Sequence, residues 1–159
     1  FIRVNNKTRK LTAEESSTYQ TVEVKDPAQT EVEVFFEMKA RHTVANSMAE
    51  ENSNQAAIEY GPLVYCCETP DADVETLDDI LLNLNAEYRQ MEMEIAGRKI
   101  QALEADEYCI RREAYDREAL YQPLRFSGLK KQRVRFIPYY AWDNREFVEM
   151  RIWFPIAYL

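Results

Sequence analysis

Glycine is scarce in this sequence, and its scarcity excludes one large class of binding site. The 159 residues contain three glycines, Gly61, Gly97 and Gly128, each isolated from the others. A phosphate-binding loop needs several closely spaced glycines, because its backbone must turn tightly and approach the ligand. We therefore expect no nucleotide-binding loop of this kind.

Histidine is rarer still, because His42 is the single one in the chain. A nucleophile–histidine arrangement would have to use it, yet no serine or cysteine lies in a nucleophile-elbow motif. Acidic pairs such as Asp78-Asp79 are common, but a glycosidase needs two carboxyls that face each other across a cleft. We predict that His42 is a surface or packed residue, and we expect no catalytic residue in this chain.

The three cysteines are too few and too badly spaced for a disulfide framework or a zinc site. Cys66 and Cys67 are adjacent, so in a strand their side chains point to opposite faces. Cys109 is distant in sequence, and no CxxC or HxxxH spacing occurs. We predict three buried free thiols and no metal ligand.

Positive charge and long apolar runs are also lacking. The net charge is −8, and alternation places Arg133 and Arg135 of "LKKQRVRF" on a solvated strand face, so we expect no nucleic-acid partner. No apolar run approaches the roughly 20 residues of a membrane span. The opening "FIRVNNKTRK" has neither a signal peptide nor an initiator Met, and it looks like part of a longer polypeptide. We expect a soluble protein and leave the compartment open between cytoplasm and periplasm.

Alternation of apolar and polar residues is what the sequence has in abundance. Residues 18–24 and 30–40 each alternate with period two, which predicts strands with one face on a core. Residues 56–68 read as a strand that Gly61-Pro62 interrupts with a bulge or bend. Residues 91–103 predict a hairpin about Ala96-Gly97.

The C-terminal region predicts a second hairpin, in which residues 132–140 pair with residues 146–155 across "AWDNR". Val148, Met150, Ile152 and Phe154 would then share one face. Residues 74–84 fit either a helical stripe or a short strand, and residues 112–120 a surface turn of helix. The fold class is therefore all-β, an antiparallel and jelly-roll-like β-sandwich with at most short helical turns.

Two long motifs add a family resemblance. "YGPLVYCCE" (60–68), "LDD" (77–79) and "IPYYAWDNREFVEMRIWFP" (137–155) resemble the C-terminal part of glycoside hydrolase family 127, the β-L-arabinofuranosidase family. The resemblance covers nearly the whole chain and is looser over the first 45 residues. It implies one accessory β-sandwich domain over 1–159, of which 1–45 alternatively derive from a preceding sandwich. It also favours an extended "DILLN" over a helix.

The resemblance further implies that the chemistry lies elsewhere. In this family a cysteine nucleophile and a zinc ion belong to an N-terminal (α/α) barrel, so zinc is expected only in that barrel and no cofactor in this chain. We assign no catalytic residue to Cys66 or Cys67. The partners implied are the catalytic barrel of the parent chain, a second copy in a homodimer, and an arabinose-containing glycan.

Three functions stay open on the sequence. The chain is an accessory domain that supports the barrel, an independent carbohydrate-binding module, or a small enzyme. For the third function we find no set of catalytic residues in the sequence. In the second case aromatic faces and hydrogen-bonding groups near the end of the chain would contact sugar. The side chains concerned are Tyr139, Tyr140, Trp142, Asp143, Asn144 and Arg145.

Overall fold

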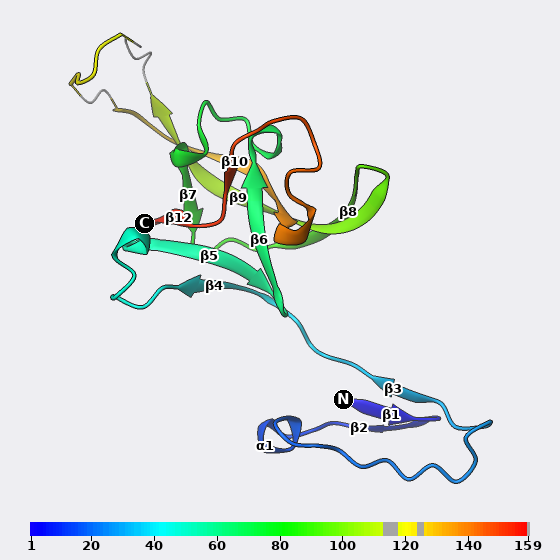
Figure 1. Ribbon diagram of the computed structural model, residues 1–159. Helices are drawn as coiled ribbons and strands as arrows, with labels where there is room; N and C mark the ends of the chain where they lie inside the picture. Colours follow the sequence, from blue (N-terminus) through cyan, green and yellow to red (C-terminus); the bar gives the residue numbers. More distant parts are fainter. Residues whose placement is uncertain (113–117, 124–125, 159) are drawn as a thin grey trace. The chain divides into compact units, whose positions relative to one another are not determined.

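The structure is a computed structural model that describes residues 1–112, 118–123 and 126–158. The chain consists of two compact units, residues 1–38 and residues 39–159, and each is described here by itself (Figure 1). The boundary thus falls between Met38 and Lys39, inside the region that the sequence analysis treated as one domain. No helix in the described ranges is long and apolar enough to cross a membrane.

The first unit is a three-stranded antiparallel sheet with the order β2-β1-β3. Its elements are β1 (Ile2–Val4), β2 (Lys7–Arg9), α1 (Ala13–Ser16) and β3 (Val32–Val34). α1 is a single turn with a capping box, in which the Thr12 hydroxyl accepts from the Glu15 amide and the Glu15 carboxylate accepts from the Thr12 amide.

The second unit is built almost wholly from strands. They are β4 (Ala40–Val44), β5 (Gln55–Tyr60), β6 (Leu63–Glu68), β7 (Ile80–Asn83), β8 (Arg89–Ile95), β9 (Arg98–Arg112), β10 (Phe126–Pro138), β11 (Met150–Arg151) and β12 (Phe154–Ala157). The helical elements are short 3₁₀ turns, η1 (Glu50–Asn52), η2 (Thr69–Asp71), η3 (Leu77–Asp79) and η4 (Tyr139–Ala141). The predicted all-β class with short helical turns is confirmed.

The strands of this unit close on themselves. Hydrogen-bonded pairs run from β5 through β6, β10, β9, β7 and β12 and then return to β5. Among the described pairs, β7–β12 alone is parallel. β4, β8 and β11 extend the circuit from β5, β9 and β6. The two layers of the sandwich are therefore joined at both edges, which leaves few strand edges unpaired.

The β8–β9 hairpin follows its predicted register. Glu94 lies opposite Lys99, and Met93 lies opposite Ile100. The two-residue loop places both Ala96 and Gly97 at positive φ, +49° and +73°, as a type I′ turn requires. The predicted hairpin is confirmed, because both its turn and its alternation are local features of the sequence.

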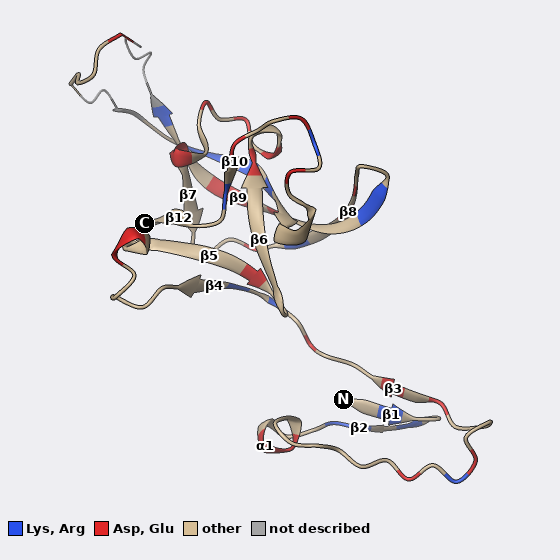
Figure 2. Cartoon of the chain, viewed as in Figure 1, with Lys and Arg blue, Asp and Glu red and all other residues tan. Residues whose placement is uncertain are grey.

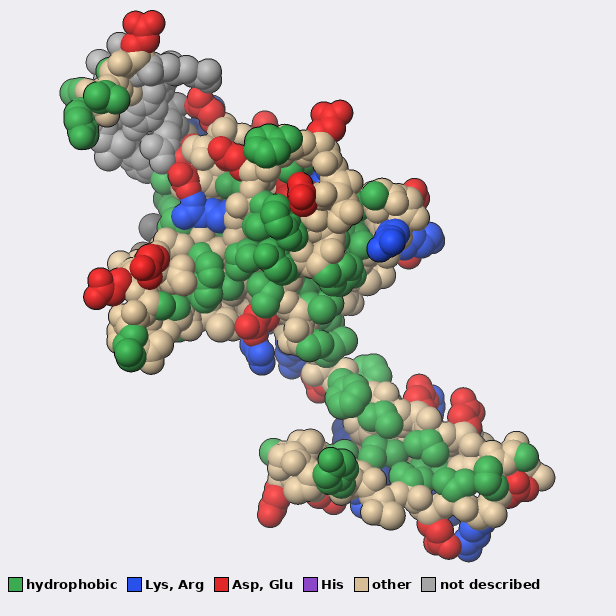
Figure 3. Space-filling view, viewed as in Figure 1, with side chains coloured by type: hydrophobic (Ala, Val, Ile, Leu, Met, Phe, Trp, Pro, Cys, Tyr) green, Lys and Arg blue, Asp and Glu red, His purple; other side chains and the backbone are tan. Residues whose placement is uncertain are grey.

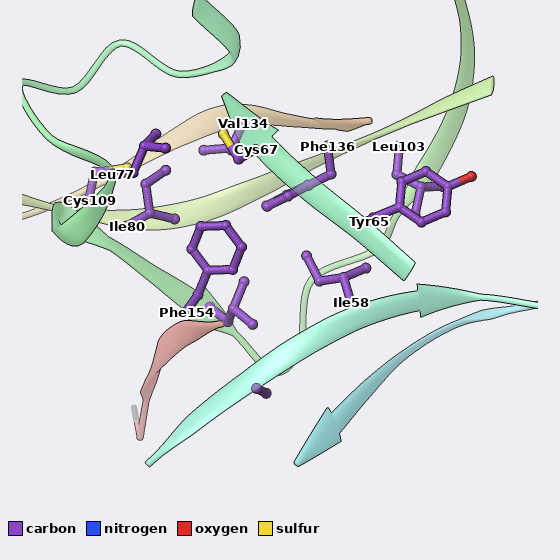
Figure 4. Packing of buried hydrophobic residues seen from close by; sticks show 12 residues of the cluster. Ile58, Tyr65, Cys67, Leu77, Ile80, Leu103, Cys109, Val134, Phe136 and Phe154 are labelled. Atoms are coloured by element: carbon purple, nitrogen blue, oxygen red, sulfur yellow. The ribbon is translucent and has the colours of Figure 1, made fainter. Parts of the chain in front are cut away.

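The main core fills the interior of the closed strands (Figure 4). Inward-facing side chains come from nearly every strand of the circuit, and the rings of Phe136 and Phe154 meet edge to face at 5.6 Å. Both rings are fully buried. The cluster consists of Ala56, Ile58, Tyr65, Cys67, Leu77, Ile80, Leu82, Leu103, Cys109, Val134, Phe136 and Phe154.

A second, smaller core lies on the outer face of β6, β8, β9 and β10. Cys66 and Ile137 contribute to it from β6 and β10, and Ala141 of η4 covers them together with Met150 and Ile152. The chain between β10 and β12 therefore crosses the outside of the sheet, and only β11 within it pairs with a strand, β6.

Because of this crossing, the predicted C-terminal hairpin does not form. β10 pairs with β9 and β6, whereas β11 pairs with β6 and β12 pairs with β5 and β7. The shared face predicted for Val148 to Phe154 is also wrong, since Met150 and Ile152 pack outside and Phe154 packs inside. Alternation alone could not reveal that the strand ends after Arg151 and begins again at Phe154.

Three further predictions of strands need correction. Residues 30–40 contain β3 and the first residue of β4 but no continuous strand, and the apolar side chains from Val32 to Met38 are exposed. Residues 18–24 form no strand. The bend at Gly61-Pro62 is a hairpin turn, because β5 and β6 pair directly across it.

The ambiguous segment 74–84 resolves into η3 followed by β7, so the extended reading is confirmed. The expected helical turn at residues 112–120 falls largely outside the described residues.

Candidate functional site

Exposed aromatic side chains gather on the segment that crosses the second core. Tyr139, Tyr140 and Trp142 are 44%, 63% and 37% exposed, and Phe147 is fully exposed. The rings of Tyr139 and Trp142 lie 6.1 Å apart and are tilted by only 16°. These four residues are called the aromatic segment below. Large apolar side chains in solvent are unfavourable, so a cluster of them indicates a binding surface.

A buried ion cluster holds this segment in place. Arg145 Nε donates to Glu68 Oε2 at 2.6 Å, and its two Nη atoms donate to the Asp71 carboxylate at 3.1 and 2.6 Å. Glu68 and Asp71 are buried at the end of β6 and in η2. The hydrogen bonds to Asp71 and Glu68 raise the pKa of Arg145 above its ordinary value. Arg145 therefore compensates two carboxylates at once.

The predicted sugar contacts thus divide into two groups. Arg145 is engaged in the ion cluster, and the Asn144 side-chain amide donates to the carbonyls of Ala141 and Trp142. The Asp143 backbone amide donates to Glu68 Oε1 at 2.9 Å, and its φ of +58° fixes the turn. The side chains of Asn144 and Arg145 and the backbone of Asp143 therefore shape the segment, while its aromatic side chains are exposed.

A small hollow lies beside Tyr140. It has a volume of about 110 Å³ and is lined by the turn of the β8–β9 hairpin, by Ala141 and by Asn144. Ligand pockets for small molecules are usually about 300–1,000 Å³, so this hollow holds part of a ligand at most. Arg98 and Lys99 line it, and Figure 2 shows basic residues at the tip of this hairpin. The hollow thus has a mixed lining, in which Ile95 and Ile100 are apolar, Arg98 and Lys99 are basic, and Tyr140 is aromatic.

The cysteines do not fit a shared metal site. All three are free and buried, and Cys66 and Cys67 belong to different cores on opposite faces of β6. Burial raises the pKa of the Cys66 thiol to about 12 and that of Cys109 to about 11, which opposes the thiolate form that binds metal. Within the described ranges, no group of three or more His, Cys, Asp or Glu residues is placed to hold a metal ion.

A second buried polar network lies inside the sheet circuit. Glu107 on β9 is fully buried, and it accepts from the Asn83 amide at 2.6 Å and from the Tyr88 hydroxyl at 2.9 Å. The Tyr88 hydroxyl also meets His42 Nε2 at 2.8 Å. Burial raises the pKa of Glu107 to about 7 and lowers the pKa of His42. His42 is thus a packed residue, as predicted.

This carboxyl group is not arranged for catalysis. A perturbed pKa indicates an active site when the group also lies in a cleft. Glu107 is instead sealed among Asn83, Tyr88 and the neighbouring strands, and its contacts are hydrogen bonds within the fold. The network stabilises the core through buried hydrogen bonds, and Glu107 is not accessible to a substrate.

The buried position of Glu107 was not predicted, although the sequence contains a signal for it. In β9 the inward positions are Leu103, Ala105, Glu107 and Cys109, so a glutamate occupies the apolar face of the strand. Such a residue must find hydrogen-bond donors in the core. Glu68 gave no comparable signal, because its partner Arg145 lies far away in sequence.

The comparisons with known proteins place this architecture in a family. The model of the glycoside hydrolase family 127 C-terminal domain matches residues 40–155. This range begins just after the boundary between the two units. The chain therefore belongs to glycoside hydrolase family 127, and the resemblance seen in the sequence is confirmed. No curated protein matches the chain.

Solved structures agree with this assignment. A protein described as a glycoside hydrolase is 33% identical with a TM-score of 0.82, and the match covers 98% of this chain and 25% of that one. A family 127 β-arabinofuranosidase is 28% identical with a TM-score of 0.73, over 98% and 23% of the two chains. A family 127 β-L-arabinofuranosidase from Geobacillus stearothermophilus T6 is 26% identical with a TM-score of 0.68, over 80% and 20%. The chain spans about a quarter of the length of the structures that it matches.

The ion cluster yields a prediction about stability. Arg145→Met leaves Glu68 and Asp71 buried without their counter-ion, so we expect it to lower the free energy of unfolding by about 3–5 kcal/mol. Denaturant melts measure this loss. The triple variant with Glu68→Gln and Asp71→Asn removes the uncompensated charges and should recover much of the stability. Arg89→Met, which changes an exposed arginine of β8, is the control. If the Arg145→Met variant is as stable as the wild type, Arg145 does not have the role given to it here.

Glu107 yields a prediction about pH. Its pKa is about 7 in the folded chain against an ordinary 4.5, so its stabilising contribution is complete below about pH 4.5 and is lost as the pH rises through 7. Glu107→Gln stays neutral. The unfolding free energy of the wild type should therefore fall relative to the variant between pH 5 and 8, by up to about 3 kcal/mol.

Thermal or urea melts at several pH values provide this difference. His42 is present in both proteins, so most of its own titration cancels. A difference between the two proteins that stays constant from pH 5 to 8 would show that Glu107 titrates normally.

Proposed function

We propose that this chain is a non-catalytic accessory domain of a longer, β-L-arabinofuranosidase-like glycoside hydrolase, and that the aromatic segment docks it against the catalytic barrel of that polypeptide. The observation that carries the proposal is the exposure of four large aromatic side chains, Tyr139, Tyr140, Trp142 and Phe147, within residues 139–147. Aromatic side chains dominate the energetics of protein interfaces when they become buried.

Three observations support this reading over an autonomous enzyme. Glu68 and Asp71 are bound to Arg145, and Glu107 is sealed in the core. Retaining and inverting glycosidases both need two carboxyls that face the glycosidic bond across a cleft. The buried thiols are held in the neutral form by burial, so they are poor nucleophiles. We place the nucleophile, the acid and any zinc in the barrel.

The rigidity of the segment supports docking as well. The ion cluster and the Asp143 amide hold residues 143–145 against Glu68. A pre-ordered surface loses little conformational entropy on binding. The occupant that we favour is the catalytic barrel because the matched structures extend over about four times the length of this chain. A second copy of the chain and a glycan are the competing occupants.

The docking proposal predicts that the separately produced catalytic portion of the parent protein binds residues 1–159. Tyr140→Ser combined with Phe147→Ser should weaken this association by about 30-fold or more, because truncating a buried aromatic anchor costs about 2 kcal/mol or more. Calorimetric titration measures the change. Tyr158→Ser alters an exposed aromatic elsewhere and should leave the affinity unchanged.

Several outcomes would contradict the proposal. Equal affinity of the double variant and the wild type would remove the aromatic segment from the interface. Self-association that is abolished by the double variant would assign the surface to a homodimer. Turnover of an aryl β-L-arabinofuranoside by this chain alone, surviving Cys66→Ala and Cys67→Ala, would make it an enzyme in its own right.

A second candidate is a carbohydrate contact through residues 139–145. The nearly parallel rings of Tyr139 and Trp142 favour it, together with the hollow beside Tyr140, where Arg98 and Lys99 supply hydrogen-bond donors. Arg145 and Asn144 would act by shaping the surface and not by touching the sugar.

Titration with arabino-oligosaccharides, followed by tryptophan fluorescence, tests this candidate. If sugar stacks on the aromatic rings, the signal should change with millimolar ligand, and the response should disappear in Trp142→Ala but persist in Trp153→Phe. If the fluorescence of the wild type does not change at saturating sugar, the carbohydrate contact is excluded and docking remains the proposed function of this surface.

A further inference from the structure

The β8–β9 hairpin carries an arginine on its apolar face. Residues that lie directly opposite each other in an antiparallel pair point to the same side of the sheet. Met93 lies opposite Ile100 and Ile95 lies opposite Arg98, so these four side chains share one face. Ile95 and Ile100 belong to the smaller core, and Met93 packs against it. Arg98 therefore stands next to the turn, at the end of a row of apolar side chains.

The Arg98 guanidinium lacks a counter-ion. Among the side chains that the structure describes, none forms an ion pair or a hydrogen bond with it. Its neighbour Lys99 points to the other face of the hairpin and pairs with Glu92 at 2.8 Å. Arg89, at the far end of the hairpin, lies opposite Glu104. In a chain with a net charge of −8, Arg98 thus keeps its donors available for an anion from outside.

The hollow of about 110 Å³ beside Tyr140 lies next to this arginine. Its apolar lining comes from the smaller core, and its polar and aromatic lining comes from the hairpin and the aromatic segment. The residues used below are Ile95, Ile100, Ala141, Arg98 and Tyr140. A Cβ atom built on Gly97 would meet nothing within 4 Å, so the turn leaves the space beside it open. Figure 3 shows Lys or Arg side chains at the end of this hairpin with hydrophobic side chains beside them.

This lining favours a ligand that is apolar on one face and anionic at one edge. A guanidinium binds a carboxylate through two parallel hydrogen bonds, which neither a hydroxyl nor an amide can match. Apolar and aromatic side chains pack on the C–H groups of a sugar ring. The hollow is smaller than an ordinary ligand pocket, so it accepts one such ring in part. The nearly parallel rings of Tyr139 and Trp142 follow on the same segment and offer stacking faces for neighbouring sugars.

We propose that the hollow is a subsite for a uronic acid residue of an acidic glycan. The sugar carboxylate pairs with Arg98, and the sugar ring packs on Tyr140 and on the apolar lining. This inference rests on the carbohydrate contact proposed above as the second candidate, and it names the class of sugar that this contact selects. A protein that inserts an aspartate or glutamate side chain at Arg98 is the competing occupant.

A nuclear magnetic resonance titration of the ¹⁵N-labelled 159-residue chain tests the proposal. D-Galacturonate and D-galactose form a matched pair of probes that differ by the carboxylate. Galacturonate should shift the amide signals of Gly97, Arg98 and Asn144, and its dissociation constant should be lower than that of galactose by about tenfold or more. Raising the salt concentration to about 0.5 M should reduce this preference, because the added ions screen an exposed charge pair.

Variants of the arginine locate the contact. Arg98→Gln should abolish the preference, so that the two sugars bind alike. Arg98→Lys keeps the charge but loses the planar fork, and it should retain only part of the preference. Arg89→Gln removes an exposed arginine from the far end of the same hairpin and should leave the preference unchanged. The amide spectrum of each variant also shows whether it is folded.

Three results would overturn the subsite. They are equal affinity of the wild type for galacturonate and galactose, a preference that survives in Arg98→Gln, and binding of acetate as tight as that of galacturonate. If neutral sugar binds with a Trp142-dependent fluorescence change but without any preference for the uronate, the carbohydrate contact stands and only this inference fails. If neither sugar binds while a glutamate-containing peptide shifts the same amides through Arg98, both fail and the hollow belongs to a protein partner.

Discussion

Insertion of the last strand between β5 and β7 is the constraint on which the larger unit depends. β12 pairs antiparallel with β5 and parallel with β7, and this closes the circuit of strands. It also carries Phe154 into the main core, against Phe136. The chain must therefore bring its C-terminal residues back to strands that lie about 70 to 100 positions earlier. Closure of this kind is entropically costly, and burial of a large ring in the interior offsets much of the cost.

The same return path explains why an aromatic surface exists. Between β10 and β12 the chain crosses the outside of the sheet, and Arg145 anchors it there to Glu68 and Asp71. Ala141, Met150 and Ile152 cover the smaller core. Ionic and apolar contacts hold this segment against the sheet, and its aromatic side chains belong to neither core and are exposed.

Buried polar groups have structural roles in both cores. Arg145 satisfies two carboxylates next to the smaller core, while Tyr88 and the Asn83 amide satisfy Glu107 within the larger one. Such networks specify one arrangement of strands, since a shifted register would leave a charge without partners.

Local chemistry in the sequence determined the hairpin at Ala96-Gly97, the opposite orientation of Cys66 and Cys67, and the all-β class, because turn geometry and period-two alternation act between near neighbours. The motifs at 60–68 and 137–155 determined the family. Tertiary structure decided the rest. Arg145 appeared in the sequence as a free hydrogen-bonding group and became an internal counter-ion, because Glu68 and Asp71 meet it only after the strands have closed. The valines of β3 have the pattern of a buried strand, yet both are exposed, because burial depends on what packs against a face and not on the alternation that creates it.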